Sequence, residues 1–97
     1  MQKLTGKQVR HLRGLGHHLH PVVMIGKEEI RESLIKSVEE ALDAHELIKI
    51  KLQEGYLMDR KEAAEILAER TGAAVVQILG KTILLFRRSP EEKVELP

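Results

Sequence analysis

The most informative residues of this sequence are basic residues that have no acidic neighbours in the chain, because they are suited to binding an anionic polymer. Residues 1–27 contain five lysines or arginines, four of the five histidines, and no aspartate or glutamate. This stretch carries a net charge of +5, residues 28–72 carry −5, and the whole chain only +1. Charge separated in this way predicts one positive face that meets a polyanion. We interpret that polyanion as RNA.

Three of these cations recur at helical spacing. Lys7, Arg10 and Arg13 fall on one side of a helical wheel, and His17 continues the row. The other side of the wheel carries the aliphatic residues Val9, Leu12, Leu15 and Leu19. The spacing predicts a helix that packs through one face and presents basic side chains to successive phosphates on the other. The alternative is an ordinary solvated face, although such faces usually mix both signs of charge.

A second candidate site follows the next apolar run. A strand, a glycine turn and a helix start would place free amides and Lys27 around a phosphate, and Gly26 would let the RNA backbone approach closely. The alternative is a simple turn with a solvated lysine. Glu28 and Glu29 act against an anion here, because carboxylates in a first helical turn occupy the same positive field.

The other groups of residues that could do chemistry do not predict catalysis or metal binding. Gly80-Lys81-Thr82 is similar to the end of a phosphate-binding P-loop, but Val75 stands where that motif needs glycine, and a strand is predicted to follow. The four N-terminal histidines invite a metal, yet no cysteine, HExxH motif or nearby acid completes a ligand set. No nucleophile is paired with a base. We therefore expect no enzyme, no cofactor and no small-molecule substrate.

The elements that must position these residues follow from periodicity and from turn and capping signals. Thr5 with Gln8 forms a capping box that starts a helix at about Gly6, and Asp59 with Glu62 forms another. Gly80-Lys81 suits a two-residue type II′ hairpin turn. The predicted elements are a helix from residue 6 that Pro21 ends, a buried strand 21–25, a helix 28–44, a strand 47–52, a helix ending at Arg70 with Gly72 behind it, and strands 74–79 and 82–87.

Length and composition limit the architecture to one domain. A chain of 97 residues with two aromatic residues can bury a single aliphatic core, which we place in residues 1–88, and leaves little aromatic surface on which bases could stack. Residues 89–97 read as a frayed acidic tail. The absence of cysteine fits a reducing compartment. The chain shows no apolar run of signal-peptide or membrane-spanning length, so we expect a cytoplasmic protein that binds no membrane.

Four segments of the sequence together carry a resemblance to a known family. They are the run from His17 to Lys27, with Pro21-Val22-Val23 at its centre, Leu4-Thr5-Gly6-Lys7-Gln8, residues 44–51, and residues 77–87. These segments are similar, in the same order, to signatures of the CRM domain family in its YhbY-like single-domain form. The resemblance covers residues 4–88. It implies an α/β fold of order α-β-α-β-α-β-β with a four-stranded mixed sheet packed with helices, similar to the C-terminal domain of translation initiation factor 3.

The resemblance also implies a function. Such domains are non-catalytic RNA-binding modules associated with precursors of the large ribosomal subunit. The family's GxxG loop maps onto Gly26, Lys27, Glu28 and Glu29, so Glu29 replaces the second glycine. We therefore expect a protein that binds large-subunit ribosomal RNA, its precursor or the ribosomal particle. The predicted RNA-binding residues are Lys7, Arg10, Arg13, His17, Gly26, Lys27, Arg87 and Arg88.

A rival interpretation comes from a different class of protein. The helix over residues 28–44 has a mostly acidic exterior that includes Glu39 and Glu40. Such a helix could dock a basic partner, for example a ribosomal protein, in a protein-interaction module. The sequence does not identify the RNA, the assembly step or the oligomeric state.

Overall fold

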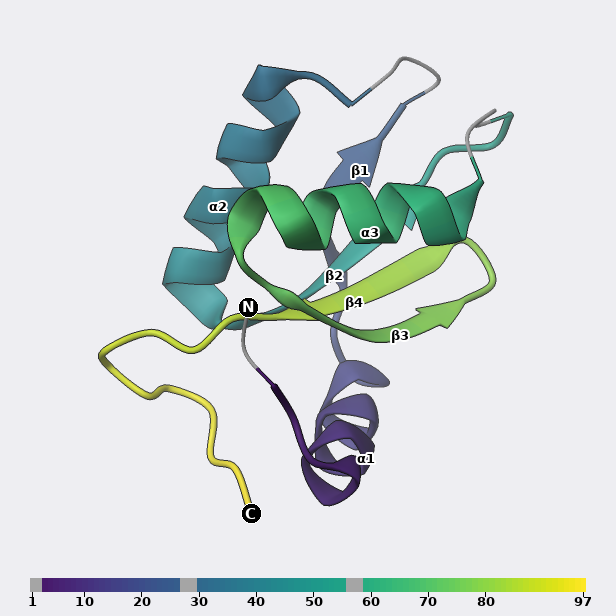
Figure 1. Ribbon diagram of the computed structural model, residues 1–97. Helices are drawn as coiled ribbons and strands as arrows, with labels where there is room; N and C mark the ends of the chain where they lie inside the picture. Colours follow the sequence, from purple (N-terminus) through teal and green to yellow (C-terminus); the bar gives the residue numbers. More distant parts are fainter. Residues whose placement is uncertain (1–2, 27–29, 56–58) are drawn as a thin grey trace.

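A four-stranded mixed sheet with helices on both faces forms the protein. The structure, a computed structural model, describes residues 3–26, 30–55 and 59–97 (Figure 1). The elements are α1 (Gly6–Gly16), β1 (Pro21–Ile25), α2 (Glu32–His45), β2 (Leu47–Leu52), α3 (Arg60–Thr71), β3 (Ala74–Leu79) and β4 (Thr82–Phe86). The predicted element order and the mixed four-stranded sheet are confirmed.

The strand order in the sheet is β1-β2-β4-β3. β1 and β2 pair in parallel, with Val23 opposite Ile50 and Ile25 opposite Leu52, and α2 makes the crossover between them. β4 pairs antiparallel with both β2 and β3. The hairpin between β3 and β4 turns at Gly80, whose φ of 57° is positive, as the first central residue of the predicted type II′ turn requires.

Each face of the sheet has its own apolar cluster. On one face, side chains such as Ile48, Ile50 and Ile83 pack against α2 and α3. On the other face, Leu47, Leu84 and Phe86 pack against Leu12 of α1, and residues of the C-terminal segment join them. The alternation of strand side chains creates this division, because neighbouring residues of a strand point to opposite faces.

Two predictions, the start of α2 and the burial of β1, differ from the structure. α2 begins at Glu32, four residues later than predicted, and its N-cap Arg31 has extended backbone angles. Ile30 fits the helical period, but it packs on the core from the extended segment before the helix. β1 is not the buried strand that its apolar sequence suggested, because it lies at the edge of the sheet and its Val22 and Met24 are exposed.

The two predicted capping boxes have different outcomes. The Thr5–Gln8 box is present, with the Gln8 backbone N–H donating to Thr5 Oγ1 at 3.1 Å and the Thr5 N–H donating to Gln8 Oε1 at 3.0 Å. Asp59 does precede α3, but its side chain makes no capping hydrogen bond, so the second box is wrong. α3 ends as predicted at Gly72, which has a left-handed φ of 72°.

The C-terminal segment, residues 89–97, was predicted to fray, but in the structure it contacts the rest of the molecule. Val94 and Leu96 pack against the cluster beneath α1, and Lys93 Nζ donates to the carbonyl oxygen of Ala44 at 2.7 Å. The segment turns back along the molecule past the end of α2, and its terminus lies beside α1 (Figure 1). The sequence offered no local signal for this arrangement, because the residues that hold the segment are distant in the chain.

Candidate functional site

The predicted row of basic side chains lies on α1 and continues to His17, the C-cap residue that follows the helix. Lys7, Arg10, Arg13 and His17 are all exposed, while Leu12 on the opposite side of the helix is fully buried. The first turn contains no acid, and the last turn contains Arg13. The structure therefore presents these four residues together on one outward surface.

Close packing on the sheet fixes the direction of this row. Gly16 lies against Leu84, so near that a Cβ on Gly16 would come within 2.5 Å of a Leu84 methyl carbon. Arg13 Nε donates to the carbonyl oxygen of Val76 at 3.4 Å, which leans this side chain toward β3. The prediction that Leu15 packs with Leu12 fails in part, since Leu15 is 40% exposed.

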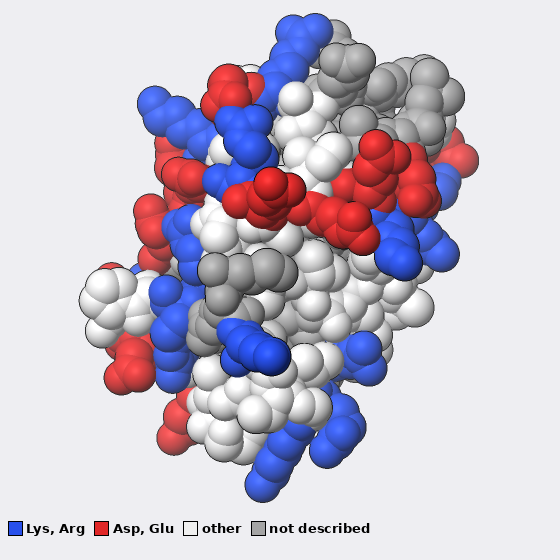
Figure 2. Space-filling model, in the orientation of Figure 1, with Lys and Arg blue, Asp and Glu red and all other residues white. Residues whose placement is uncertain are grey.

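The charge around α1 is unbalanced. Lys7, Arg10 and Arg13 form no ion pair with any residue in the described part of the chain. Figure 2 shows basic side chains projecting from the end of the molecule that α1 forms and an acidic band across the region of α3. A surface of cations that have no ion-pair partner among the described residues attracts an anionic polymer.

The predicted glycine site is not beside this row. Gly26 follows β1 at the end opposite the α1 connection, so α1 and Gly26 lie toward opposite ends of the sheet (Figure 1). The Gln53 backbone N–H donates to the Ile25 carbonyl at 2.8 Å and ties this end of β1 to the residue after β2. Lys27, Glu28 and Glu29 lie outside the described residues.

Two lysines that sequence reasoning left out of the site lie between these two ends. Lys49 and Lys51 belong to β2 and point away from the α2–α3 cluster, on the face that α1 covers in part. Lys51 pairs with Met24 of β1 and with Thr82 of β4, and it is exposed. Their alternation with Ile48, Ile50 and Leu52 marked them as outward residues, but only the fold shows that they share a face with α1.

Arg87 has its partners within the protein. Its guanidinium donates to the carbonyl oxygens of Thr71 at 2.7 Å and Glu39 at 3.3 Å, and it pairs with Asp43 at 2.7 Å. The side chain is only 22% exposed. Arg87 thus joins the ends of α2 and α3, on the side of the sheet opposite α1.

Arg88 holds the C-terminal segment. It pairs with Glu46 at 3.3 Å, donates to the carbonyl of Val94, and lies 3.6 Å from Glu92. Both arginines, Arg87 and Arg88, therefore contact other residues of the same chain, and they do not extend the α1 row.

Glu46 is the centre of that attachment and was not singled out from the sequence. Glu46 is fully buried, and its backbone φ of 65° is positive. Its carboxylate accepts hydrogen bonds from the backbone N–H and hydroxyl of Ser89 and from the N–H of Val94, at 2.6 to 2.7 Å. Burial acts to raise the pKa of Glu46, but these hydrogen bonds and the charge of Arg88 outweigh it and hold the pKa below the usual range of a glutamate. Glu46 is therefore an ionised structural group.

Two further features bear on the class of protein. None of the helices in the described ranges is long and apolar enough to cross a membrane. Within those same ranges, no three histidine, aspartate or glutamate side chains are grouped so as to hold a metal ion.

Comparison with known proteins identifies the class that this fold and basic surface define. The pattern of the CRS1 / YhbY (CRM) domain matches residues 4–87, and the chain belongs to that family. The family predicted from the sequence is thus confirmed, and so is its α/β fold.

Two relatives and one solved structure match this chain over nearly all of their own lengths. "Probable RNA-binding protein YqeI" of Bacillus subtilis is 42% identical over 97% of this chain and 99% of its own length. "RNA-binding protein" of Haemophilus influenzae is 39% identical over 100% of this chain and 98% of its own. The solution structure of SAV1595 from Staphylococcus aureus is 44% identical, covers 98% of this chain and 100% of that one, and superposes with a TM-score of 0.84.

Proposed function

We propose that the protein is a non-catalytic RNA-binding protein whose principal contact surface is the basic row of α1. The observation that carries this proposal is the set of exposed cations Lys7, Arg10 and Arg13, which form no ion pair with a described residue. Side chains of this kind gain free energy from phosphates by releasing condensed counterions. The names of the Bacillus and Haemophilus relatives support RNA as the polyanion.

The contact surface continues along the sheet. His17 extends the α1 row, and Lys49 and Lys51 lead across the sheet toward Gly26, where Lys27 is proposed to add a further charge. The partners of Arg87 and Arg88 within the chain leave these two arginines outside the proposed surface. With two aromatic residues in the chain, most affinity is expected from the RNA backbone and shape.

The biological target is proposed from the family resemblance. We infer that the RNA is large-subunit ribosomal RNA or its precursor, bound in the cytoplasm during assembly of the ribosomal particle. In-cell crosslinking followed by sequencing of the bound RNA tests this inference directly. Enrichment of large-subunit sequences is expected, and recovery spread evenly over cellular RNA would contradict the ribosomal target while leaving general RNA binding intact.

Charge reversal tests the RNA surface itself. Arg10→Glu combined with Arg13→Glu should lower the affinity for a structured RNA at least about a hundredfold, because it replaces two phosphate contacts by repulsions. The matched control is Lys36→Glu with Lys61→Glu, which changes the net charge equally on exposed positions of α2 and α3. Equal losses in both variants would show that only net charge matters and would contradict the α1 surface.

Charge reversal also tests the protein-interaction alternative. A module that docks a basic partner through α2 should lose that partner when Glu39 and Glu40 are changed to lysine, and its RNA affinity should not depend on α1. The partial burial of Glu39 and the exposure of Glu40 offer only part of such a surface. This favours RNA binding as the first function.

A further inference from the structure

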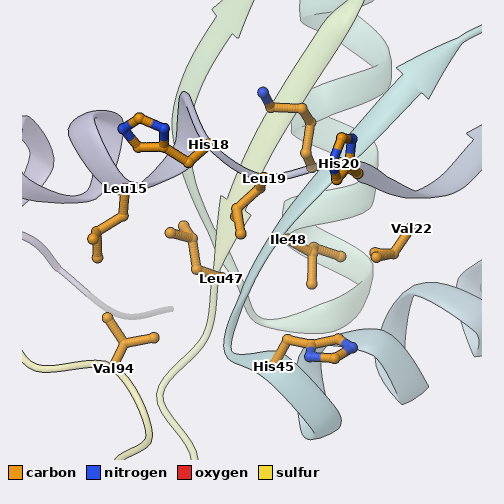
Figure 3. A pocket seen from close by; sticks show the side chains of 10 residues that line it. Leu15, His18, Leu19, His20, Val22, His45, Leu47, Ile48 and Val94 are labelled. Carbon is orange, nitrogen blue, oxygen red and sulfur yellow. The ribbon is translucent and has the colours of Figure 1, made fainter.

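A cavity beside the end of α1 is not used by the basic row. Its volume is about 550 Å³, within the range of roughly 300–1,000 Å³ typical of sites for small organic groups. It lies between the last turn of α1, β1, β2 and the end of α2 (Figure 3). The exposed aliphatic side chains of Leu15 and Val22 stand on its two sides.

The cavity has an apolar interior and a polar rim. Leu19, Leu47, Ile48 and Val94 line its apolar part, and the two strand residues among them, Leu47 and Ile48, are almost completely buried. Exposed imidazoles reach the rim from three segments, His18 after α1, His20 before β1 and His45 at the end of α2 (Figure 3). Lys49 adds an ammonium group, and no acidic side chain lines the cavity.

The local backbone keeps this rim in place. After α1 ends, the His18 N–H donates to the carbonyl of Leu15 at 3.2 Å, and the Leu19 N–H donates to the carbonyl of Gly16 at 3.1 Å. These turns place Leu19 under α1 while His18 stays outside. The cavity is thus built from the same helix end that carries Arg13 and His17.

We propose that this cavity binds one unstacked nucleobase of the RNA whose phosphates lie along α1, a proposal that rests on the proposed function. The apolar part and the imidazoles suit the faces of a planar ring, since histidine is among the side chains on which bases stack. Lys49 and the acid-free lining suit the flanking phosphates. An aliphatic side chain of a partner protein would fill the interior but leave the imidazoles and Lys49 of the rim unused.

A contrasting cavity supports the assignment. The space beside α3 and β3 is of similar size, about 500 Å³, but Glu65 and Glu69 line it. Two carboxylates would repel a nucleotide of RNA. Continuity with the basic row and complementary charge therefore favour the cavity at the end of α1 for a base.

The test compares two RNA hairpins that differ only in the loop, one with its loop bases and one with an abasic loop of the same sugar-phosphate length. The protein should bind the base-bearing hairpin roughly tenfold more tightly, as one stacked base contributes. Leu15→Gln with Val22→Gln should lose this preference and keep its affinity for the abasic hairpin. Met24→Gln, an exposed residue of the same strand that does not line the cavity, should retain the preference.

The outcomes separate the two proposals. Equal affinity of the unchanged protein for both hairpins would overturn the base site and leave backbone binding standing, whereas no binding to either hairpin at low salt would overturn both. Methyl NMR of the unchanged protein gives a second readout that needs no variant. Shifts of the Leu15 and Val22 methyl signals that require loop bases support the site. Shifts confined to the outer face of α1 would show that the cavity serves another occupant, such as an apolar side chain.

Discussion

The two faces of the sheet differ in how completely helices cover them. One face is closed by α2 and α3 over a continuous aliphatic cluster that includes Ile35, Ile50, Leu67 and Ile83. The other face carries a smaller cluster under α1 and the C-terminal segment. Beside this cluster, Val22 and Met24 remain exposed in β1. The difference indicates that the first face supplies most of the stability and that the second face is left partly exposed.

Charge follows the same division. All seven acids that lie within helices belong to α2 and α3 on the closed face, and α1 on the open face carries none. Mutually attractive ion pairs such as Arg70–Glu32 belong to the closed face, while the cations of α1 have no such partner among the described residues. Exposed ion pairs stabilise a fold only slightly, so the cost of leaving the α1 cations unpaired is small.

The largest expected effect comes from neighbouring residues of β2 that point to opposite faces. Ile50→Ala should lower the free energy of unfolding by about 3 to 5 kcal/mol, because Ile50 is fully buried and its removal leaves a cavity. Lys51→Ala should change stability by less than about 0.5 kcal/mol and instead reduce the salt slope of RNA binding by about 1. Urea unfolding and RNA titration measure the two effects, and a stability loss shared by both variants would break the comparison.

The attachment of the C-terminal segment is the next test. Glu46→Ala should lower the free energy of unfolding by about 2 kcal/mol, because the N–H groups of Ser89 and Val94 lose their acceptor. Because the pKa of Glu46 is lower in the folded protein than in the unfolded chain, its contribution is present above the pKa of an unfolded glutamate and is lost as the pH falls through the lower folded pKa. Glu46→Gln should remove this part of the acid sensitivity. An unchanged acid profile in that variant would show that Glu46 does not hold the segment through its charge.

Two glycines of α1 sharpen the account of how the helix is seated. Gly16→Ala should destabilise the protein by about 1 to 2 kcal/mol, since the new methyl group would press on the nearly buried Leu84. Gly14→Ala meets no atom within 4 Å and should stabilise it by about 0.5 to 1 kcal/mol through helix propensity. Thermal unfolding distinguishes them, and changes of the same sign would contradict the close packing of α1.

Local patterns allowed most of the fold to be predicted from the sequence. The Thr5–Gln8 box, the Gly72 terminus and the Gly80 turn depend on residues within a few positions of each other, and all three are present. The Asp59–Glu62 pair has the same spacing, yet its cap bond is absent. The spacing of two residues therefore shows that a capping box can form, but it does not determine whether the side chains adopt the conformation that forms it.

The site was harder to predict because charge in a sequence does not reveal its partners. Arg87 looked like a free cation, but Asp43, Glu39 and Thr71 reach it from distant segments. Lys49 was visible only as an outward residue of a strand, and the face it shares with α1 depends on the sheet order. The α1 row could be predicted because its four residues follow one helical period and need no distant partner.

The most direct test of the central claim is the salt dependence of RNA binding. If about six phosphates are neutralised, the slope of log K against log salt should be roughly −4 to −5. Lys7→Ala with Arg10→Ala should reduce its magnitude by about 1.5 to 2, and Lys36→Ala with Lys61→Ala should leave it unchanged. A flat salt response of the unchanged protein, or an equal slope in both double variants, would contradict an RNA surface on α1.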